Sequence, residues 1–213
     1  TDRTVRTVAS RTIRARRSLR SRRSRRRRIA ATTDVVHKPA QSADRERFLI
    51  SRDASDGSHR QVFEERIDGG GALESVVKAD FGALAESVSA DGRYIALTHD
   101  DRRDRNDILV HDRENGETRP FLATQYDEDH PAFSPDGTLL AYAANDSGRS
   151  EVYVRPFPGP GGKYTISNHG GTGPVWSRDG RELFYAEGDK LMRVGIERAP
   201  RFTATPPQIL FET

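Results

Sequence analysis

The chain has 213 residues, of which 34% are hydrophobic and 31% are charged, and its formal net charge is +3 at pH 7. The length suits one large domain or two small ones, and no window approaches the ~18 apolar residues of a membrane-spanning helix, so the composition is not that of a membrane protein. Cysteine is absent, which excludes disulfides, thiolate metal sites and cysteine nucleophiles.

Residues 1–38 differ in charge from the rest of the chain. They carry 14 Lys and Arg residues against two acidic residues, a formal charge of +12, whereas residues 39–213 carry 21 basic and 30 acidic residues, a formal charge of −9. Because clustered guanidinium groups repel one another and little apolar surface is available to bury, we expect residues 1–38 to form a disordered tail or linker. No signal peptide is visible, and the start at Thr1 without methionine indicates a fragment or a processed product.

The arginine run in this tail is a candidate electrostatic arm. Arginine side chains neutralise phosphates and release counterions, so nucleic acid or an anionic lipid surface is a candidate partner. No aromatic residue interrupts the run, which argues against base stacking. Two alternatives stay open, a solvated tail and a stretch translated out of frame upstream of the repeats. The candidate anion-binding residues are Arg22, Arg23, Arg25, Arg26, Arg27 and Arg28.

Residues 39–213 are predicted to contain four copies of one structural unit. The aligned segments are SADRERFLI (42–50), SADGRYIAL (89–97), SPDGTLLAY (134–142) and SRDGRELFY (177–185). Their aspartates, 47, 45 and 43 residues apart, are Asp44, Asp91, Asp136 and Asp179. A period of about 40–50 residues is typical of a repeat array or a β-propeller. The expected units are residues 42–80, 81–125, 126–168 and 169–213.

Each unit is predicted to form a turn and four strands. Ser134-Pro135-Asp136-Gly137 suits a type I turn. The runs after the turns are apolar on both faces, as in LLAYAA (139–144), so they should be strands covered on both sides. Third strands are QVFEER, DILVHD, EVYVRP and LMRVGI, and fourth strands are ESVV, TRPFL, KYTIS and PQILF. Phe133 and Trp176, at equivalent positions, are expected to pack between units.

The predicted fold is therefore an all-β propeller of about four four-stranded blades. Closed rings use about four to eight blades, and the first copy has no clear first strand before Ser42. We therefore expect a partial ring whose end blades leave pairing edges exposed.

Several motifs of the repeats resemble those of a known family. The SPDG turn, the EVYV strand and the WSRDG turn resemble the TolB-type, WD-like β-propeller repeat, and residues 149–194 closely resemble the C-terminal propeller of some bacterial receptor-like serine/threonine kinases. The similarity covers residues 42–213 and departs at the first copy, where DRE replaces DGR. It implies a binding or sensor module of a larger bacterial protein, in a periplasmic or other extracytoplasmic compartment.

Motifs of catalysis are missing from the chain. The kinase phosphate loop, catalytic loop and metal-binding aspartate are absent, as is the G-x-S-x-G elbow of serine hydrolases. PGPGGKY (158–164) lacks the first glycine and the Ser or Thr of a phosphate loop, so it is interpreted as a strand-to-strand loop. We expect no enzyme activity and no cofactor, and we assign no metal-binding residues. A substrate-gating propeller of a hydrolase or peptidase stays open as an alternative.

The candidate ligand site lies in two loops at equivalent positions of successive units. YDEDHP (126–131) and NHGGTGP (168–174) are predicted to connect a fourth strand to the next first strand, where such loops face one mouth of a propeller channel. The candidate ligand funnel consists of Asp127, Glu128, Asp129, His130 and His169. It could take a protein or small ligand, or a cation through hard oxygen atoms. The alternative is that these are solvated turn residues.

If the arginine run is a binding arm, DNA should bind the chain more weakly as salt rises and far more weakly once residues 1–38 are deleted. Fluorescence anisotropy with a labelled duplex at about 50 and 200 mM salt measures both effects, and a loss on the order of 10³ is expected for six phosphate contacts. DNA binding that changes with neither the salt concentration nor the deletion would contradict the hypothesis that the arginine run is a binding arm.

Overall fold

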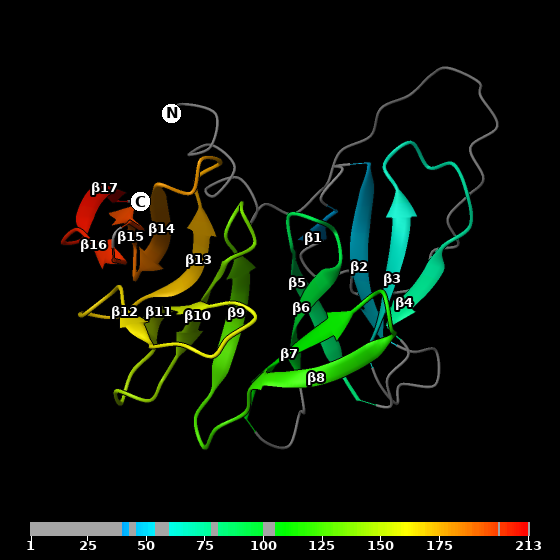
Figure 1. The fold of residues 1–213 in the computed structure, drawn as a ribbon, viewed down its shortest axis with the longest axis horizontal. Helices are drawn as coiled ribbons and strands as arrows, with labels where there is room; N and C mark the ends of the chain where they lie inside the picture. The colour runs from blue at the N-terminus through cyan, green and yellow to red at the C-terminus, as the bar shows by residue number, and fades with distance from the viewer. Residues whose placement is uncertain are drawn as a thin grey trace. The chain divides into compact units, whose positions relative to one another are not determined.

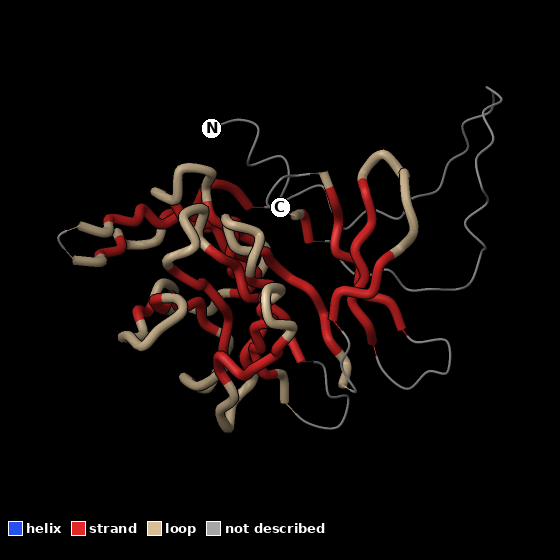
Figure 2. The backbone as a smooth tube through the Cα atoms, turned by 45° about the vertical axis from the view of Figure 1, so that its right-hand side comes forward, coloured by secondary structure: helices blue, strands red, loops and turns tan. Residues whose placement is uncertain are grey.

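The structure is a computed structural model of the chain, and it describes residues 40–42, 46–53, 60–77, 81–99, 105–199 and 201–212. All of these residues belong to one compact unit, Val35–Thr213. Their regular elements are all β-strands, and Figures 1 and 2 show them as successive sheets. Nothing helical in the described ranges has the length and apolar character needed to cross a membrane.

Each sheet is one antiparallel blade, and its strands are paired in chain order. Blade 1 contains β1 (Ala40–Gln41), β2 (Arg47–Asp53), β3 (Arg60–Arg66) and β4 (Glu74–Val77). Blade 2 contains β5 (Ala83–Val88), β6 (Tyr94–His99), β7 (Asp107–Asp112) and β8 (Glu117–Leu122). Blade 3 contains β9 (Glu128–Phe133), β10 (Leu139–Ala144), β11 (Glu151–Pro156) and β12 (Tyr164–Thr165). Blade 4 contains β13 (Thr172–Trp176), β14 (Glu182–Glu187), β15 (Lys190–Glu197), β16 (Thr203–Ala204) and β17 (Gln208–Glu212).

The predicted second, third and fourth strands are confirmed in all four units. In blade 4 both β16 and β17 pair with β15, and β17 is the predicted PQILF strand. The expectation that the first copy lacks a first strand needs correction, because β1 pairs Ala40 with Leu49 and Gln41 with Phe48. A strand of two residues is too short to show an alternating pattern in the sequence.

The Ser-x-Asp-Gly turns are built by one repeated set of hydrogen bonds. Ser134 Oγ donates to Asp136 Oδ1 (2.6 Å) and accepts from Leu139 N (3.0 Å). The Gly137 N–H closes the turn on the Ser134 carbonyl (2.8 Å), and Gly137 has a φ of +72°, which costs glycine little. The same bonds recur in residues 89–94 and 177–182. The turn that contains Asp44 lies outside the described residues.

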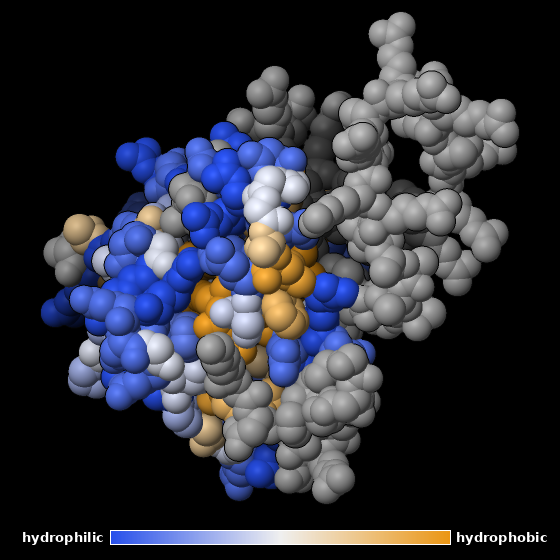
Figure 3. Space-filling view, turned by 90° about the vertical axis from the view of Figure 1, so that its right-hand side faces the viewer, coloured by the Kyte–Doolittle hydropathy of each residue, from blue (hydrophilic) through white to orange (hydrophobic). Residues whose placement is uncertain are grey.

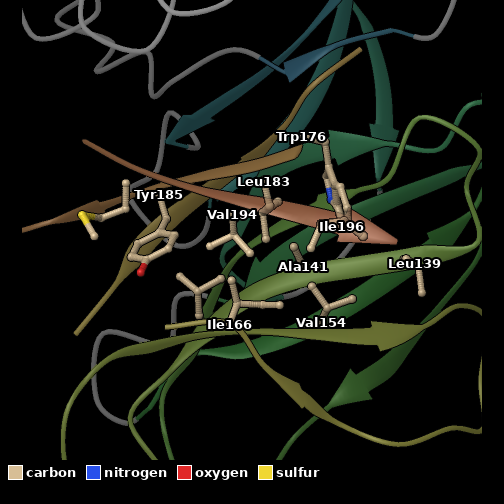
Figure 4. Close-up of a cluster of buried hydrophobic side chains, with 11 residues drawn as sticks. Leu139, Ala141, Val154, Ile166, Trp176, Leu183, Tyr185, Val194 and Ile196 are labelled. Atoms are coloured by element: carbon tan, nitrogen blue, oxygen red, sulfur yellow. The ribbon is translucent and has the colours of Figure 1, made fainter. Parts of the chain in front are cut away.

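The middle strands of the blades are apolar on both faces, as predicted. Successive residues of a strand point to opposite faces, and in β10 both Leu140 and Ala141 are 0% exposed. Leu140 belongs to a hydrophobic cluster with blade 2, and Ala141 belongs to a cluster with blade 4. Figure 4 shows the second cluster, in which Trp176 and Ile196 of blade 4 lie with Leu139 of blade 3. One strand therefore serves two interfaces.

The expectation that Phe133 and Trp176 pack between blades is confirmed. Phe133 lies in the cluster shared by blades 2 and 3, and Trp176 lies in the cluster shared by blades 3 and 4. One hydrogen bond also links each of the three junctions between successive blades. These bonds are Ala85 N to Ser51 Oγ (2.9 Å), Phe133 N to Ser87 Oγ (3.0 Å) and Trp176 Nε1 to Ala132 O (3.0 Å). Each bond ties the first strand of one blade to the preceding blade.

Blade 1 has an apolar face that points away from blade 2. Leu49 is buried in the cluster between the two blades, so its neighbour Ile50 points to the opposite face. Ile50 pairs with Phe63 across the sheet, and both are only partly buried. Figure 3 shows apolar surface on this side of the molecule. An apolar face on an end blade agrees with the predicted partial ring.

Truncation at a junction should cost far more stability than truncation at the surface. Leu140→Ala is expected to lower the free energy of unfolding by about 2–5 kcal/mol, because it leaves a cavity between blades 2 and 3. Leu210→Ala in β17, where the side chain is 37% exposed, should change the same quantity by about 0.5 kcal/mol. Urea unfolding followed by circular dichroism measures both, and equal effects would contradict the inter-blade core.

Candidate functional site

The predicted funnel residues lie in different kinds of structure. Asp127 directly precedes β9, and His169 lies in the loop between β12 and β13. Glu128, Asp129 and His130 are part of strand β9, so the prediction that residues 126–131 form a loop is wrong beyond Asp127. Likewise, β13 begins at Thr172, inside the predicted loop 168–174. The starts of β9 and β13 were hidden in the sequence, because each of these two strands contains a bulge.

The bulge in β9 holds His130 in an unusual backbone conformation. Asp129 pairs with Ala143 and Ala132 pairs with Ala141, so three steps along β9 match two steps along β10. His130 has a φ of +52°, and it is alone among the described non-glycine residues in having a positive φ. The left-handed region is costly for residues that carry a Cβ, although histidine tolerates it better than most.

The next blade repeats the bulge with glycine. Thr172 pairs with Ala186 and Val175 pairs with Phe184, which again sets three steps against two. Gly173, three residues before Trp176 as His130 is before Phe133, has a φ of +60°. Blades 3 and 4 therefore share a left-handed residue at this point, and blade 3 places an imidazole where blade 4 has no side chain.

Asp129 and His130 form the accessible polar pair of the site. His130 Nδ1 lies 2.9 Å from Asp129 Oδ1, and the two side chains are 42% and 29% exposed. A protonated imidazole would make this contact an ion pair, and the exposed part of each side chain can reach a ligand.

Glu128 and Asp127 are used to hold loops together. The buried Glu128 carboxylate accepts hydrogen bonds from the Thr124 N–H (3.3 Å) and the Thr124 hydroxyl, and burial raises its pKa against the effect of these bonds. Asp127 Oδ1 accepts from Asn106 N (3.2 Å), and Asp127 Oδ2 accepts from Asn145 Nδ2 (2.7 Å). These two carboxylates therefore hold neighbouring loops, whereas the Asp129 and His130 side chains contact each other and are partly exposed.

His169 is positioned by a buried carboxylate. The backbone N–H of Gly170 donates to both oxygens of Glu151 (3.1 Å each), and Ser167 Oγ donates to the same carboxylate while it accepts from Val152 N (2.7 Å). His169 itself is exposed. In the described part of the chain, no three His, Cys, Asp or Glu side chains gather as metal ligands would. Among the described residues, the candidate side chains thus do not form a single ligand cluster.

Two clefts between blades were missed by sequence reasoning. The first, the blade 1–2 cleft, has a volume of about 360 Å³. It is lined by Arg47, Glu64, Glu74, Ser75, Val76, His111, Arg113 and Gly116. Glu64 accepts hydrogen bonds from Arg47 (3.0 Å) and from Arg113 (3.2 and 2.9 Å), so its buried charge is paired inside the protein. Nothing in the segment QVFEER marks this glutamate as an inter-blade partner.

The second, the blade 2–3 cleft, has a volume of about 420 Å³. It is lined by Val110, Arg119, Pro120, Phe121, Arg155, Pro156, Phe157, Pro158, Gly159, Pro160 and Gly161. Four of these eleven residues come from the segment 158–164, which resembles a phosphate loop in the sequence. The interpretation of that segment as a loop between strands is confirmed, since residues 157–163 join β11 to β12.

Comparison with known proteins identifies the fold. No protein-family model matches the chain, and no curated protein matches it. Among solved structures, a putative TolB from Agrobacterium tumefaciens is 17% identical with a TM-score of 0.66, over 81% of this chain and 63% of that one. TolB from Acinetobacter baumannii is 15% identical with a TM-score of 0.65, over 84% of this chain and 44% of that one. A nidogen/laminin complex matches with 13% identity and a TM-score of 0.61, over 76% of this chain and 61% of that one.

These similarities confirm the predicted fold class. The chain has a TolB-like β-propeller fold, and it spans less than two thirds of the length of each of these solved chains. At identities of 13–17%, the likeness concerns the fold.

Two substitutions at His130 separate its backbone strain from its side chain. His130→Gly removes the cost of a Cβ at a φ of +52°, whereas His130→Ala keeps it. The glycine variant is therefore expected to be more stable than the alanine variant by about 1 kcal/mol, as measured by chemical unfolding. An alanine variant that equals or exceeds the glycine variant in stability would show that the bulge does not constrain this residue.

Proposed function

We propose that the chain is a non-catalytic binding module, whose edge formed by β9 and the loop before β13 contacts a protein partner or ligand. The observation that carries the proposal is the backbone at His130. A strained, half-exposed imidazole stands beside a half-exposed carboxylate at a position that the next blade fills with glycine. Strained residues concentrate at functional sites, because the strain persists where a side chain is needed in one place.

The support for a binding role comes from how the surrounding groups are used. Asp127 and Glu128 accept hydrogen bonds that order the loops, and Glu151 orders the loop that carries His169. The edge is thus rigid before any partner arrives, which reduces the entropy lost on binding. Exposed polar groups on an ordered frame are suited to recognition.

The context of the module is also part of the proposal. By its resemblance to the propellers of bacterial receptor-like kinases, the chain would be the sensor or interaction part of a larger bacterial protein in an extracytoplasmic compartment. The gene that encodes it tests this directly. A kinase domain and a membrane span in the same reading frame are expected, and a complete coding sequence without either would contradict the kinase context.

Selection from a phage-displayed random peptide library on the immobilised chain tests the binding edge. Enriched peptides should bind the chain, and a triple variant with Asp129→Asn, His130→Gly and His169→Ala should weaken that binding by about tenfold or more, since charge-assisted hydrogen bonds contribute about 1.5–3 kcal/mol. Biolayer interferometry with the synthesised peptides measures the change.

The matched control changes the exposed turn of blade 4 through Arg178→Gln and Arg181→Gln, and it should leave peptide affinity unchanged. Two results would contradict the proposal. One is a library that yields no peptide above the unselected background. The other is a set of peptides that bind the triple variant as tightly as the unchanged chain.

A further inference from the structure

The blade 2–3 cleft has two arginines that point into the same space. Arg119 is the cross-strand partner of Val110, and Arg155 is the cross-strand partner of Leu140. Val110 and Leu140 belong to the cluster between blades 2 and 3, and paired residues of neighbouring strands share a face. The register of the two sheets therefore directs both guanidinium groups into the space between these blades.

The charge of these arginines is not matched within the cleft. The described residues that line it include no aspartate and no glutamate. The Arg155 side chain interacts with the Tyr142 hydroxyl, but its Nε is shielded from solvent and has no hydrogen-bond acceptor among the described residues. This arrangement differs from the blade 1–2 cleft, where Glu64 pairs with two arginines. A ligand that brings negative charge would supply the countercharge that the lining of the cleft lacks.

Aromatic rings form a fixed apolar wall beside the arginines. Phe157 is 9% exposed, and its ring lies 4.8 Å from that of Phe133, 5.1 Å from that of Tyr94 and 5.7 Å from that of Phe121, centroid to centroid. Such contacts hold Phe157 in place and leave an apolar surface on the cleft. The ligand should therefore carry an apolar group as well as a charge.

The loop that closes the cleft is tightly packed. A Cβ on Gly161 would lie 2.4 Å from Pro156 Cγ. The backbone of the loop therefore packs so closely on Pro156 that only glycine fits at this position. The opposing walls come from β7 and β8 of blade 2 and from the end of β11 in blade 3. A preformed cleft of about 420 Å³ is within the usual size range of small-ligand sites, roughly 300–1,000 Å³.

We propose that the blade 2–3 cleft binds a carboxylate joined to an aromatic or other apolar group, with Arg119 and Arg155 on the carboxylate and Phe121 and Phe157 against the apolar group. Guanidinium groups match carboxylates through paired N–H donors, and the same residues stack on flat rings. A free aromatic acid and the C-terminal residue of a peptide share this chemistry. The site is separate from the edge at His130 and does not rest on the function proposed for it.

Isothermal titration calorimetry on the full chain tests the proposal with two pairs of ligands, each pair consisting of an acid and its amide. The first pair is 3-phenylpropionate and its amide, and the second is a tetrapeptide ending in phenylalanine with a free or an amidated C-terminus. The acids should bind at least about tenfold more tightly than the amides, and their binding should weaken as salt rises. Tighter binding of the peptide acid would identify a chain terminus as the ligand, and tighter binding of phenylpropionate would identify a small acid.

Variants assign the binding to the two arginines. Arg119→Gln and Arg155→Gln should each lower affinity for the acid by about tenfold, whereas Arg178→Gln in the exposed turn of blade 4 removes the same charge and should not change it. Arg119 is exposed, so its variant tests the site even where Arg155→Gln lowers stability. Arg155→Lys, which keeps the charge without the fork of donors, should recover only part of the affinity.

Three results would overturn the assignment. They are acids that bind no better than their amides, acid binding that is unchanged in Arg119→Gln, and inorganic phosphate that binds as tightly as the aromatic acids. The last result would show that the apolar wall takes no part.

Discussion

A strand with apolar side chains on both faces needs a neighbouring layer on each side, because either face would otherwise be exposed to water. β10 is such a strand, with all six of its residues buried, and its two faces belong to different hydrophobic clusters. Each blade in the described chain is therefore stabilised by the blade before or after it. The turns set the spacing between blades, and inter-blade hydrogen bonds such as Trp176 Nε1 to Ala132 O hold the first strands in register.

This dependence places the candidate sites at the junctions. The first strand of blade 3 lies between two junctions, because Phe133 belongs to the cluster shared with blade 2 and Ala132 packs against the cluster shared with blade 4. The bulge in this strand leaves the side chains of Asp129 and His130 partly exposed. Each cleft is lined in part by a fourth strand, β4 in the blade 1–2 cleft and β8 in the blade 2–3 cleft. In one cleft Glu64 neutralises the arginines, and in the other Arg119 and Arg155 face aromatic rings. The same architecture thus yields an internally satisfied junction and one that suits a ligand.

Much of the fold could be predicted because its signals are local. Ser-x-Asp-Gly turns and strands such as LLAYAA carry their conformation in neighbouring residues, so the second and third strands and their turns were located correctly. The first strands were missed in part, because the bulge at His130 and the proline after it break the alternation that marks a strand. The candidate site was predicted less well. Asp127, Glu128 and Asp129 look alike in the sequence, and only the hydrogen bonds made in the folded chain distinguish the two that hold loops from the exposed one. Arg119 and Arg155 line the same cleft because of the register of two sheets, and no local sequence pattern encodes that register.

The central claim is that successive blades stabilise one another through their facing strands, and the single tryptophan of the chain reports on it. The Trp176 indole N–H belongs to blade 4 and donates to a carbonyl of blade 3, with the side chain 8% exposed. Hydrogen exchange of this one indole resonance, followed by NMR, tests the junction directly. Exchange as slow as that of the β10 and β14 amides would show that the blades separate only when the whole unit unfolds. Rapid indole exchange while those amides remain protected would show that blades 3 and 4 fold independently, and it would contradict the account.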